Sequence, residues 1–201
     1  AGQLLKSNSY TFDVCFSSCL RRSIDTLHIV SDTLGIDVPV HRSWRLNERH
    51  YGALQGLNRD EVRKQYGSEQ VTVWQQQFEV APPPLETGDV RFPGHDPRYA
   101  ELAIDDLPRT ETLKQVRSRA LIYWNRVIVP EVKRAQRILV VAHGNSIRAL
   151  TTYLDSVAEN DIPRIKRPLT GEPFVYEFGQ DAMPLRSYSI RPAPKLKRWS
   201  Q

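Results

Sequence analysis

The most regular hydrophobic pattern in the chain lies over residues 137–154, where a short apolar run is followed by helical spacing. Residues 138–142 are all apolar, which indicates a strand covered on both faces, as in a parallel sheet between helices. Gly144 marks a tight turn, and the apolar spacing after it predicts a helix that begins near Ser146. Residues 12–34 repeat the pattern, with a buried strand over 12–18 and a helix over 20–34 that ends at Gly35. Ser17 or Ser18 is a candidate cap for that helix.

The other segments complete an alternation of strands and helices. The pattern predicts the end of a helix over 1–8, a short strand over 37–40, two short helices over 59–78 broken near Gly67, and late strands over 173–178 and 185–190. The longest helix is predicted over 110–127, with Thr110 as its N-cap and Pro130 near its final turn. Residues 81–100, which are rich in proline, predict a long ordered loop. This alternation indicates an α/β fold with a mostly parallel sheet.

Composition places the chain among ordinary globular proteins. It has 201 residues, 40% hydrophobic and 25% charged, which predicts a single domain over 1–201 with a basic tail over 191–201. No window approaches the roughly 18 apolar residues of a membrane span, and the first residues lack a signal-peptide pattern.

Cys15 and Cys19 have no second Cys or His pair nearby, so we interpret them as reduced thiols of a cytoplasmic protein without a metal site. The chain begins with Ala1 and its only methionine is Met183, so we interpret it as an incomplete reading frame.

The net charge of +5 favours an anionic ligand. Outside the tail the basic residues are scattered, which is typical of a solvated surface. A small anion is therefore a better candidate ligand than nucleic acid.

Two candidate ligand-binding residues follow predicted strands. His143 lies just past the carboxyl end of a buried strand, where ligands bind in open α/β sheets, and just before a helix N-terminus, which attracts anions. Asn145 and Ser146 can either cap this helix or bind a ligand oxygen. Arg22 follows the other buried strand and offers a bidentate fork to phosphate or carboxylate. The alternatives are a turn histidine bonded to backbone and an exposed arginine in the first turn of a helix.

Glu48 lies in the polar run "LNERHYGALQGLNR" over 46–59. A carboxyl group acts as a general acid only when burial or a nearby anion raises its pKa. A phosphate-bearing substrate would supply such an anion. The alternative is a solvated loop carboxylate.

These segments together resemble the cofactor-dependent phosphoglycerate mutases of the histidine phosphatase superfamily. The matching runs are "FSSCLRRSIDT", "SWRLNERHYGALQGLN", "FPGHDPRYA", "LPRTETL", "VVAHGNSIRAL" and "TGEPFVYEF". The resemblance implies a three-layer α/β/α fold and a phosphohistidine route between 3-phosphoglycerate and 2-phosphoglycerate in glycolysis and gluconeogenesis. It further implies priming by 2,3-bisphosphoglycerate, no metal, no nucleic-acid or membrane partner, and a homodimer or homotetramer.

The resemblance also assigns roles to particular residues. Glu48 would exchange a proton with the substrate hydroxyl, His143 would stabilise the transferring phosphoryl group, and Arg22 would hold the phosphate. The remaining implied contacts are with substrate, and they involve Arg49, His50, Tyr51, Arg59, Gln75, Gln76, Gly144 and Asn145.

Three departures from the family pattern leave several functions open. The family's first strand, which is central in its sheet and ends in Arg-His-Gly-Glu with the nucleophilic histidine, has no counterpart here, so the edges of its neighbours would be exposed. Gln75 and Gln76 replace a pair of arginines, and Arg59 replaces a lysine. The chain is therefore interpreted as a mutase lacking its nucleophile and inactive alone, as a non-enzymatic protein that binds phosphorylated metabolites or an active partner subunit, or as a bisphosphoglycerate mutase or phosphatase.

Overall fold

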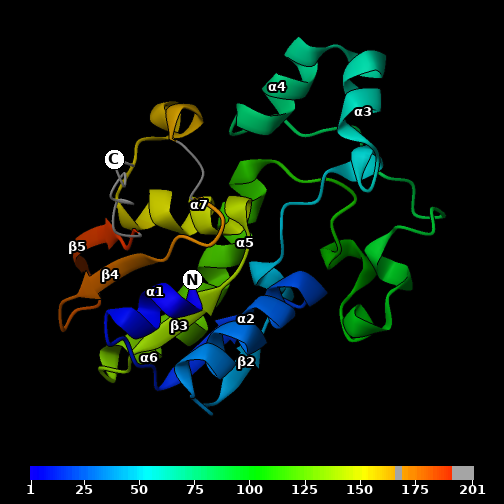
Figure 1. Ribbon diagram of the computed structural model, residues 1–201. Coiled ribbons are helices and arrows are strands. Elements are labelled where there is room, and N and C mark those ends of the chain that lie inside the picture. The colour runs from blue at the N-terminus through cyan, green and yellow to red at the C-terminus, as the bar shows by residue number, and fades with distance from the viewer. Residues whose placement is uncertain (166–168, 192–201) are drawn as a thin grey trace, which may run out of the picture.

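The computed structural model of the chain describes residues 1–165 and 169–191, so nearly all of the predicted basic tail lies outside the described residues. A three-stranded sheet stands between two layers of helices (Figure 1). This confirms the predicted α/β fold with a parallel sheet. No helix in the described ranges has the length and apolar character needed to cross a membrane.

The sheet consists of β1 (Val14–Ser17), β2 (Val40–Arg42) and β3 (Ile138–Val141), in the order β2-β1-β3 with all strands parallel. The central strand β1 is buried along its whole length. Ser17 is in register with Val141, so the residues that follow β1 and β3 emerge side by side at one edge of the sheet. This register brings the two predicted ligand-binding segments together.

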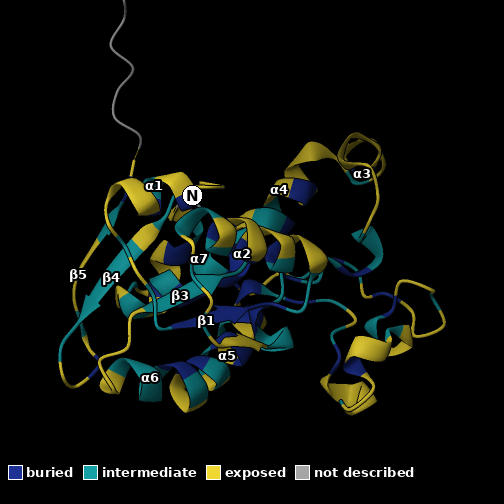
Figure 2. Ribbon diagram, turned by 60° about the horizontal axis from the view of Figure 1, so that its bottom comes forward, coloured by how far each residue is buried: buried dark blue, intermediate teal, exposed yellow. Residues whose placement is uncertain are grey.

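Alternating residues of the strands enter two separate hydrophobic clusters. Phe16 and Val140 pack on one face with the helices α5 (Leu113–Tyr123) and α7 (Gly144–Leu154), while Leu139 packs on the other with α1 (Gly2–Ser7) and α2 (Arg21–Leu34). In Figure 2 the buried residues lie along the sheet and on the inner sides of these helices. The period-2 pattern of β3 therefore supplies both cores, as expected for a strand between two helical layers.

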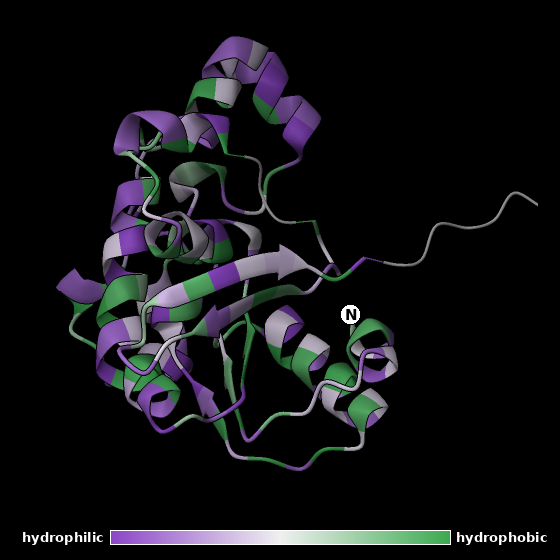
Figure 3. Cartoon of the chain, turned by 90° about the vertical axis from the view of Figure 1, so that its left-hand side faces the viewer, coloured by the Kyte–Doolittle hydropathy of each residue, from purple (hydrophilic) through white to green (hydrophobic). Residues whose placement is uncertain are grey.

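The sheet is interrupted beside β3. The strands β4 (Phe174–Phe178) and β5 (Pro184–Ser189) form their own antiparallel hairpin, yet Phe178 packs with Val140, and Val175 belongs to the same cluster as Leu139. Figure 3 shows hydrophilic and hydrophobic residues along this hairpin. Among the described strands β3 pairs with β1 alone, so its other edge makes no ladder hydrogen bonds.

Two peripheral units flank the site. The helices α3 (Arg59–Tyr66) and α4 (Ser68–Gln76) form a hairpin around Trp74, with a break at Gly67, as predicted. The proline-rich loop is ordered around Leu85, Phe92, Tyr99 and Leu107. Short 3₁₀ turns span Trp44–Leu46, Gly52–Leu54, Pro93–His95, Pro97–Tyr99, Ile104–Asp106 and Glu159–Arg164.

Several predicted boundaries were wrong for identifiable reasons. The N-cap of α5 is Thr112, because its hydroxyl pairs with Gln115 in a capping box, whereas the Thr110 hydroxyl donates to the Pro82 carbonyl. The long helix continues beyond residue 127 through a π-helical turn, Trp124–Ile128, and α6 (Val129–Lys133), so it ends at Lys133 and Pro130 lies near its final turn, as predicted. Neither Ser17 nor Ser18 caps α2, whose N-cap is Leu20.

Two further boundaries moved by a few residues. The second strand begins at Val40, where β1 offers hydrogen-bonding partners, instead of spanning 37–40. The helix predicted near Ser146 begins already at Gly144, because His143 serves as its N-cap. The Ser146 hydroxyl accepts a hydrogen bond from the His143 N–H over 3.0 Å. Ser146 is therefore committed to the helix start, which was one of the two alternatives for it.

Candidate phosphate-binding site

His143 lies between the sheet and the N-terminus of α7. Its Nε2 and the Ser18 hydroxyl are hydrogen-bonded at 2.7 Å, so the first residue after β1 contacts a residue just after β3. The imidazole is 7% exposed. Burial, and secondarily the charges of Arg22 and Arg119, lower the pKa of His143 to about 4. At neutral pH this imidazole is therefore uncharged and acts through its ring nitrogens.

Glu48 faces the same helix N-terminus. Its Oε1 accepts hydrogen bonds from the backbone N–H of Arg49 at 2.8 Å and of Asn145 at 3.2 Å. The Asn145 side chain in turn donates to the Tyr51 hydroxyl over 3.2 Å. A carboxylate at this position is stabilised by the positive end of the helix dipole. The predicted site residues Glu48, Tyr51 and Asn145 are thus brought together around the start of α7, next to Gly144.

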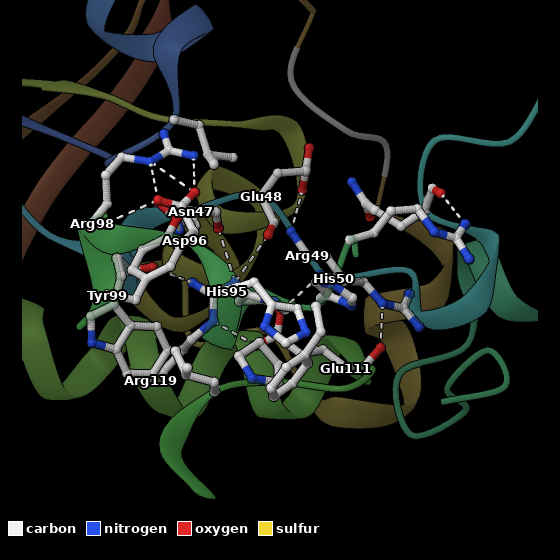
Figure 4. Close-up of a pocket in the computed structure, with 18 of the residues that line it drawn as sticks. Asn47, Glu48, Arg49, His50, His95, Asp96, Arg98, Tyr99, Glu111 and Arg119 are labelled. Atoms are coloured by element: carbon white, nitrogen blue, oxygen red, sulfur yellow. Dashed lines mark hydrogen bonds and ion pairs between the residues drawn. The ribbon is translucent and has the colours of Figure 1, made fainter. Parts of the chain in front are cut away.

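The backbone that carries Glu48 is held by a buried ion pair. Arg119, on α5, donates to both carboxylate oxygens of Glu111, at 2.6 and 3.0 Å, and the two side chains are 7% and 5% exposed. The Arg119 guanidinium also donates to the carbonyls of Arg45 and Asn47. Glu111 completes the arrangement by accepting from the backbone N–H of His50. The pair therefore fixes the chain on both sides of Glu48, as Figure 4 shows.

Arg49 also holds the backbone beside Glu48, through contacts with other segments of the chain. Its guanidinium donates to the carbonyls of Glu111, Trp74 and Val80 at 2.7 to 2.8 Å, and the residue is 1% exposed. The resemblance implied that Arg49 contacts substrate. That contact stays a prediction, since Arg49 also lines the cavity, while the guanidinium contacts join the Glu48 loop to the end of α4.

A cavity of about 500 Å³ opens beside Glu48. Arg22, Glu48 and His50 lie in its wall, and the proline-rich loop forms the opposite side through residues such as His95 and Arg98 (Figure 4). Arg22 is an exposed residue in the first turn of α2 and lies close enough to lower the His143 pKa. The carboxylate and the cation predicted to handle a phosphate ester therefore share one cavity.

The helix hairpin keeps three predicted contacts away from this cavity. Arg59 and Gln76 are exposed and Gln75 is half-buried, on α3 and α4, and none of them lines the cavity wall. Their predicted contact with substrate stays a prediction. No feature of the described residues gives these positions a second cation in place of the arginines that the family carries there.

Of the four other histidines, His50 and His95 line the cavity, whereas His28 and His41 do not. His50 accepts from the Gly52 N–H through Nδ1, and burial is the main cause that lowers its pKa. Nε2 of His95 lies 3.0 Å from the Thr87 carbonyl. His41 stacks on Phe16 at β2, and His28 is an exposed residue of α2. Cys15 and Cys19 are free thiols, and the described residues contain no cluster of three or more metal-ligating side chains.

Sequence reasoning missed Ser18, Glu111 and Arg119. A signal for Arg119 is present, because it falls between Val116 and Ala120 on the apolar face of a predicted helix. An arginine at such a position is buried only when a carboxylate and carbonyls satisfy it. Glu111 is the nearest preceding acid, but its sequence context, "TETL", was interpreted as a helix start.

The fold and the site define a class of protein. A parallel sheet carries an arginine and a histidine after neighbouring strands, with a helix N-terminus and a carboxylate beside them, which is an arrangement suited to a phosphate ester. The chain matches the sequence profile of the histidine phosphatase superfamily (branch 1) over residues 1–90 and 93–188. It belongs to that family.

Solved structures show the same fold. A mycobacterial glucosyl-3-phosphoglycerate phosphatase is similar with a TM-score of 0.63 at 19% identity, covering 94% of this chain and 79% of that one. The α-ribazole phosphatase from Shigella flexneri gives 0.63 at 19%, covering 92% and 78%. YhfR from Bacillus stearothermophilus gives 0.62 at 18%, covering 90% and 74%. At these identities the likeness concerns the fold alone.

Proposed function

We propose that this chain binds small phosphate monoesters at the carboxyl ends of β1 and β3. The observation that carries the proposal is that His143 and Glu48 meet at the N-terminus of α7 while Arg22 shares a cavity wall with Glu48. Phosphoryl transfer relies on positioning and on neutralising oxygen charge, which are the tasks that an arginine, a preorganised imidazole and helix N–H groups perform. Glu48 is placed to exchange a proton with a substrate hydroxyl.

The candidate functions differ in whether the site catalyses a reaction or only binds a phosphate ester. By resemblance to the family, interconversion of phosphoglycerates and hydrolysis of a phosphate ester would both proceed through a nucleophilic histidine beside His143, and no described histidine follows β1 or β3 in the way that His143 does. This favours a second candidate, a non-enzymatic protein that binds phosphorylated metabolites or an active partner subunit. The two enzymatic candidates rest on the family and on the phosphatases that share its fold.

The residues present do not fit 2,3-bisphosphoglycerate as a primer. That compound carries two phosphates and a carboxylate and therefore calls for more than one cationic cluster. Gln75 and Gln76 bring no charge, and neither lines the cavity. We derive no step through this compound.

Phosphate binding is expected to depend on Arg22. Arg22→Met removes a charge-assisted fork and is expected to weaken binding of inorganic phosphate by roughly tenfold or more. Arg21→Met is the matched control, because its side chain is 91% exposed and pairs with Asp25 on the surface. Isothermal calorimetry at fixed ionic strength measures both variants. Equal affinities for the wild type and Arg22→Met would place the phosphate elsewhere.

The chain alone is expected to form no phosphohistidine. Incubation with ³²P-labelled 2,3-bisphosphoglycerate should leave no acid-labile label on the protein, because the family's Arg-His-Gly-Glu run with its nucleophilic histidine has no counterpart in the sequence. Acid-labile phosphate on this chain, lost in His143→Gln, would show that His143 itself acts as a nucleophile and would contradict the non-enzymatic candidate.

A further inference from the structure

The arginines around the cavity are largely committed to other groups. Arg91 makes a bidentate pair with Asp89, with Nη2 and Oδ2 at 2.6 Å, and also donates to the Gln55 carbonyl. Arg98 pairs with Asp96 and donates to the Cys19 carbonyl over 2.8 Å. Each pair is close to neutral as a unit. The proline-rich wall of the cavity therefore presents little net charge to a ligand.

The two buried arginines of the lining, Arg119 and Arg49, also have partners within the protein. Arg119 is paired with Glu111, and the Arg49 guanidinium is surrounded by carbonyls. Among the arginines that line the cavity, Arg22 is the one for which the described residues provide neither a carboxylate nor a carbonyl partner. It is exposed, so its charge is accessible from solvent. This distribution of charge provides for one phosphate and for no second anion.

Much of the rest of the lining is apolar or aromatic and includes Leu20, Trp44, Val90, Phe92, Tyr99 and Leu107. The polar side chains beside them are Asn47, His50, Gln55 and His95. Phe92, Tyr99 and Leu107 are nearly buried and belong to one hydrophobic cluster, whereas Val90 is 88% exposed at the cavity. Trp44 is half-buried, with the Arg45 guanidinium over its ring. Such surfaces bind the apolar part of a ligand and leave its orientation to a few polar groups.

We propose that this cavity takes phosphate monoesters whose remaining part is uncharged and apolar, such as an aryl group, and discriminates against esters that carry a further carboxylate, such as phosphoglycerate. The inference rests on the proposed function, because it assumes that the phosphate lies at Arg22. A carboxylate placed beyond the phosphate would meet neutral ion pairs, apolar side chains and the like charge of Glu48. An aryl group would instead remove apolar surface from water against Trp44 and Val90.

Calorimetric titration of the full chain with three ligands tests the inference. At pH 7 and one ionic strength, phenyl phosphate is expected to bind about tenfold more tightly than 3-phosphoglycerate and more tightly than inorganic phosphate. Equal or tighter binding of 3-phosphoglycerate overturns the inference, and so does equal binding of phenyl phosphate and inorganic phosphate. If inorganic phosphate also fails to bind, the proposed function falls together with the inference.

A positive charge introduced at the cavity tests whether the ligand binds there. Val90→Lys is expected to tighten 3-phosphoglycerate binding by roughly fivefold or more while leaving phenyl phosphate nearly unchanged, because it supplies the missing cation. Ile104→Lys is the matched control, since Ile104 is 64% exposed and does not line the cavity. An equal gain for both variants would mean that long-range charge alone is responsible, and it would overturn the placement of the ligand in this cavity.

Discussion

Replacing Arg119 by methionine is expected to lower the free energy of unfolding by about 3–5 kcal/mol. The change leaves the Glu111 carboxylate buried with the His50 N–H but without its cationic partner. It also removes the donors to the carbonyls of Arg45 and Asn47. A buried charge without compensation costs far more than the pair itself contributes to stability. Urea unfolding followed by circular dichroism measures the difference as a shift in midpoint.

Two controls separate the buried pair from the general loss of an arginine. Arg164→Met removes a cation whose side chain is 82% exposed and paired with Asp161, so it is expected to change stability by less than about 1 kcal/mol. The double variant Glu111→Gln with Arg119→Met removes the stranded charge and should recover part of the loss. A cost for Arg119→Met no larger than that for Arg164→Met would contradict the assigned role.

The stability of the chain is expected to fall as the pH is lowered from about 6.5 to about 4, because the folded state holds His143 neutral while the unfolded chain protonates it. In that window the unfolded state binds more protons, so the free energy of unfolding rises with pH. The pKa difference corresponds to about 3 kcal/mol at its limit below pH 4. Denaturation midpoints between pH 4 and 7.5 measure the slope.

His143→Gln is expected to reduce the dependence of the free energy of unfolding on pH while keeping a hydrogen-bonding partner for the Ser18 hydroxyl. His28→Gln, on the exposed side of α2, should leave it unchanged. Some slope remains in either variant, because burial also lowers the pKa of His50. The carboxylates Asp13 and Asp89 add little to this slope, because arginine partners lower their pKa to about 2 and most of their contribution to stability is lost below pH 4. An unchanged slope in His143→Gln would contradict the burial of a neutral imidazole.

The local pattern of apolar and polar residues was sufficient to predict most of the helices and strands. The two strand–turn–helix units were predicted because apolar runs, Gly35 and Gly144 act within a few residues of one another. Boundaries failed where a distant partner decided them, as when the Pro82 carbonyl took the Thr110 hydroxyl and left Thr112 to cap α5. These partners are far apart in sequence and cannot be inferred from spacing.

The candidate site was predicted in part for the same reason. Glu48, His143 and Arg22 lie after predicted strands or in a motif shared with a known family. In the structure Glu48 and His143 lie at one helix start, and Arg22 lines the same cavity as Glu48. The guanidinium contacts of Arg49 were not predictable, because its partners are backbone carbonyls from three separate segments. Likewise, the pairing of Arg91 with Asp89 and of Arg98 with Asp96 decides the charge of the cavity, which composition alone cannot give.

The free edge of β3 has a consequence for where further strands can join the sheet. Its four residues, Ile138–Val141, carry no charged side chain, whereas Arg186 lies on β5. An uncharged edge with unpaired N–H and C=O groups is a template for strands of other molecules, and natural proteins protect such edges with lysine, proline or bulges. Among the described strands the outer edge of β3 has no strand partner, so we expect it to be the point where an added strand would extend this sheet.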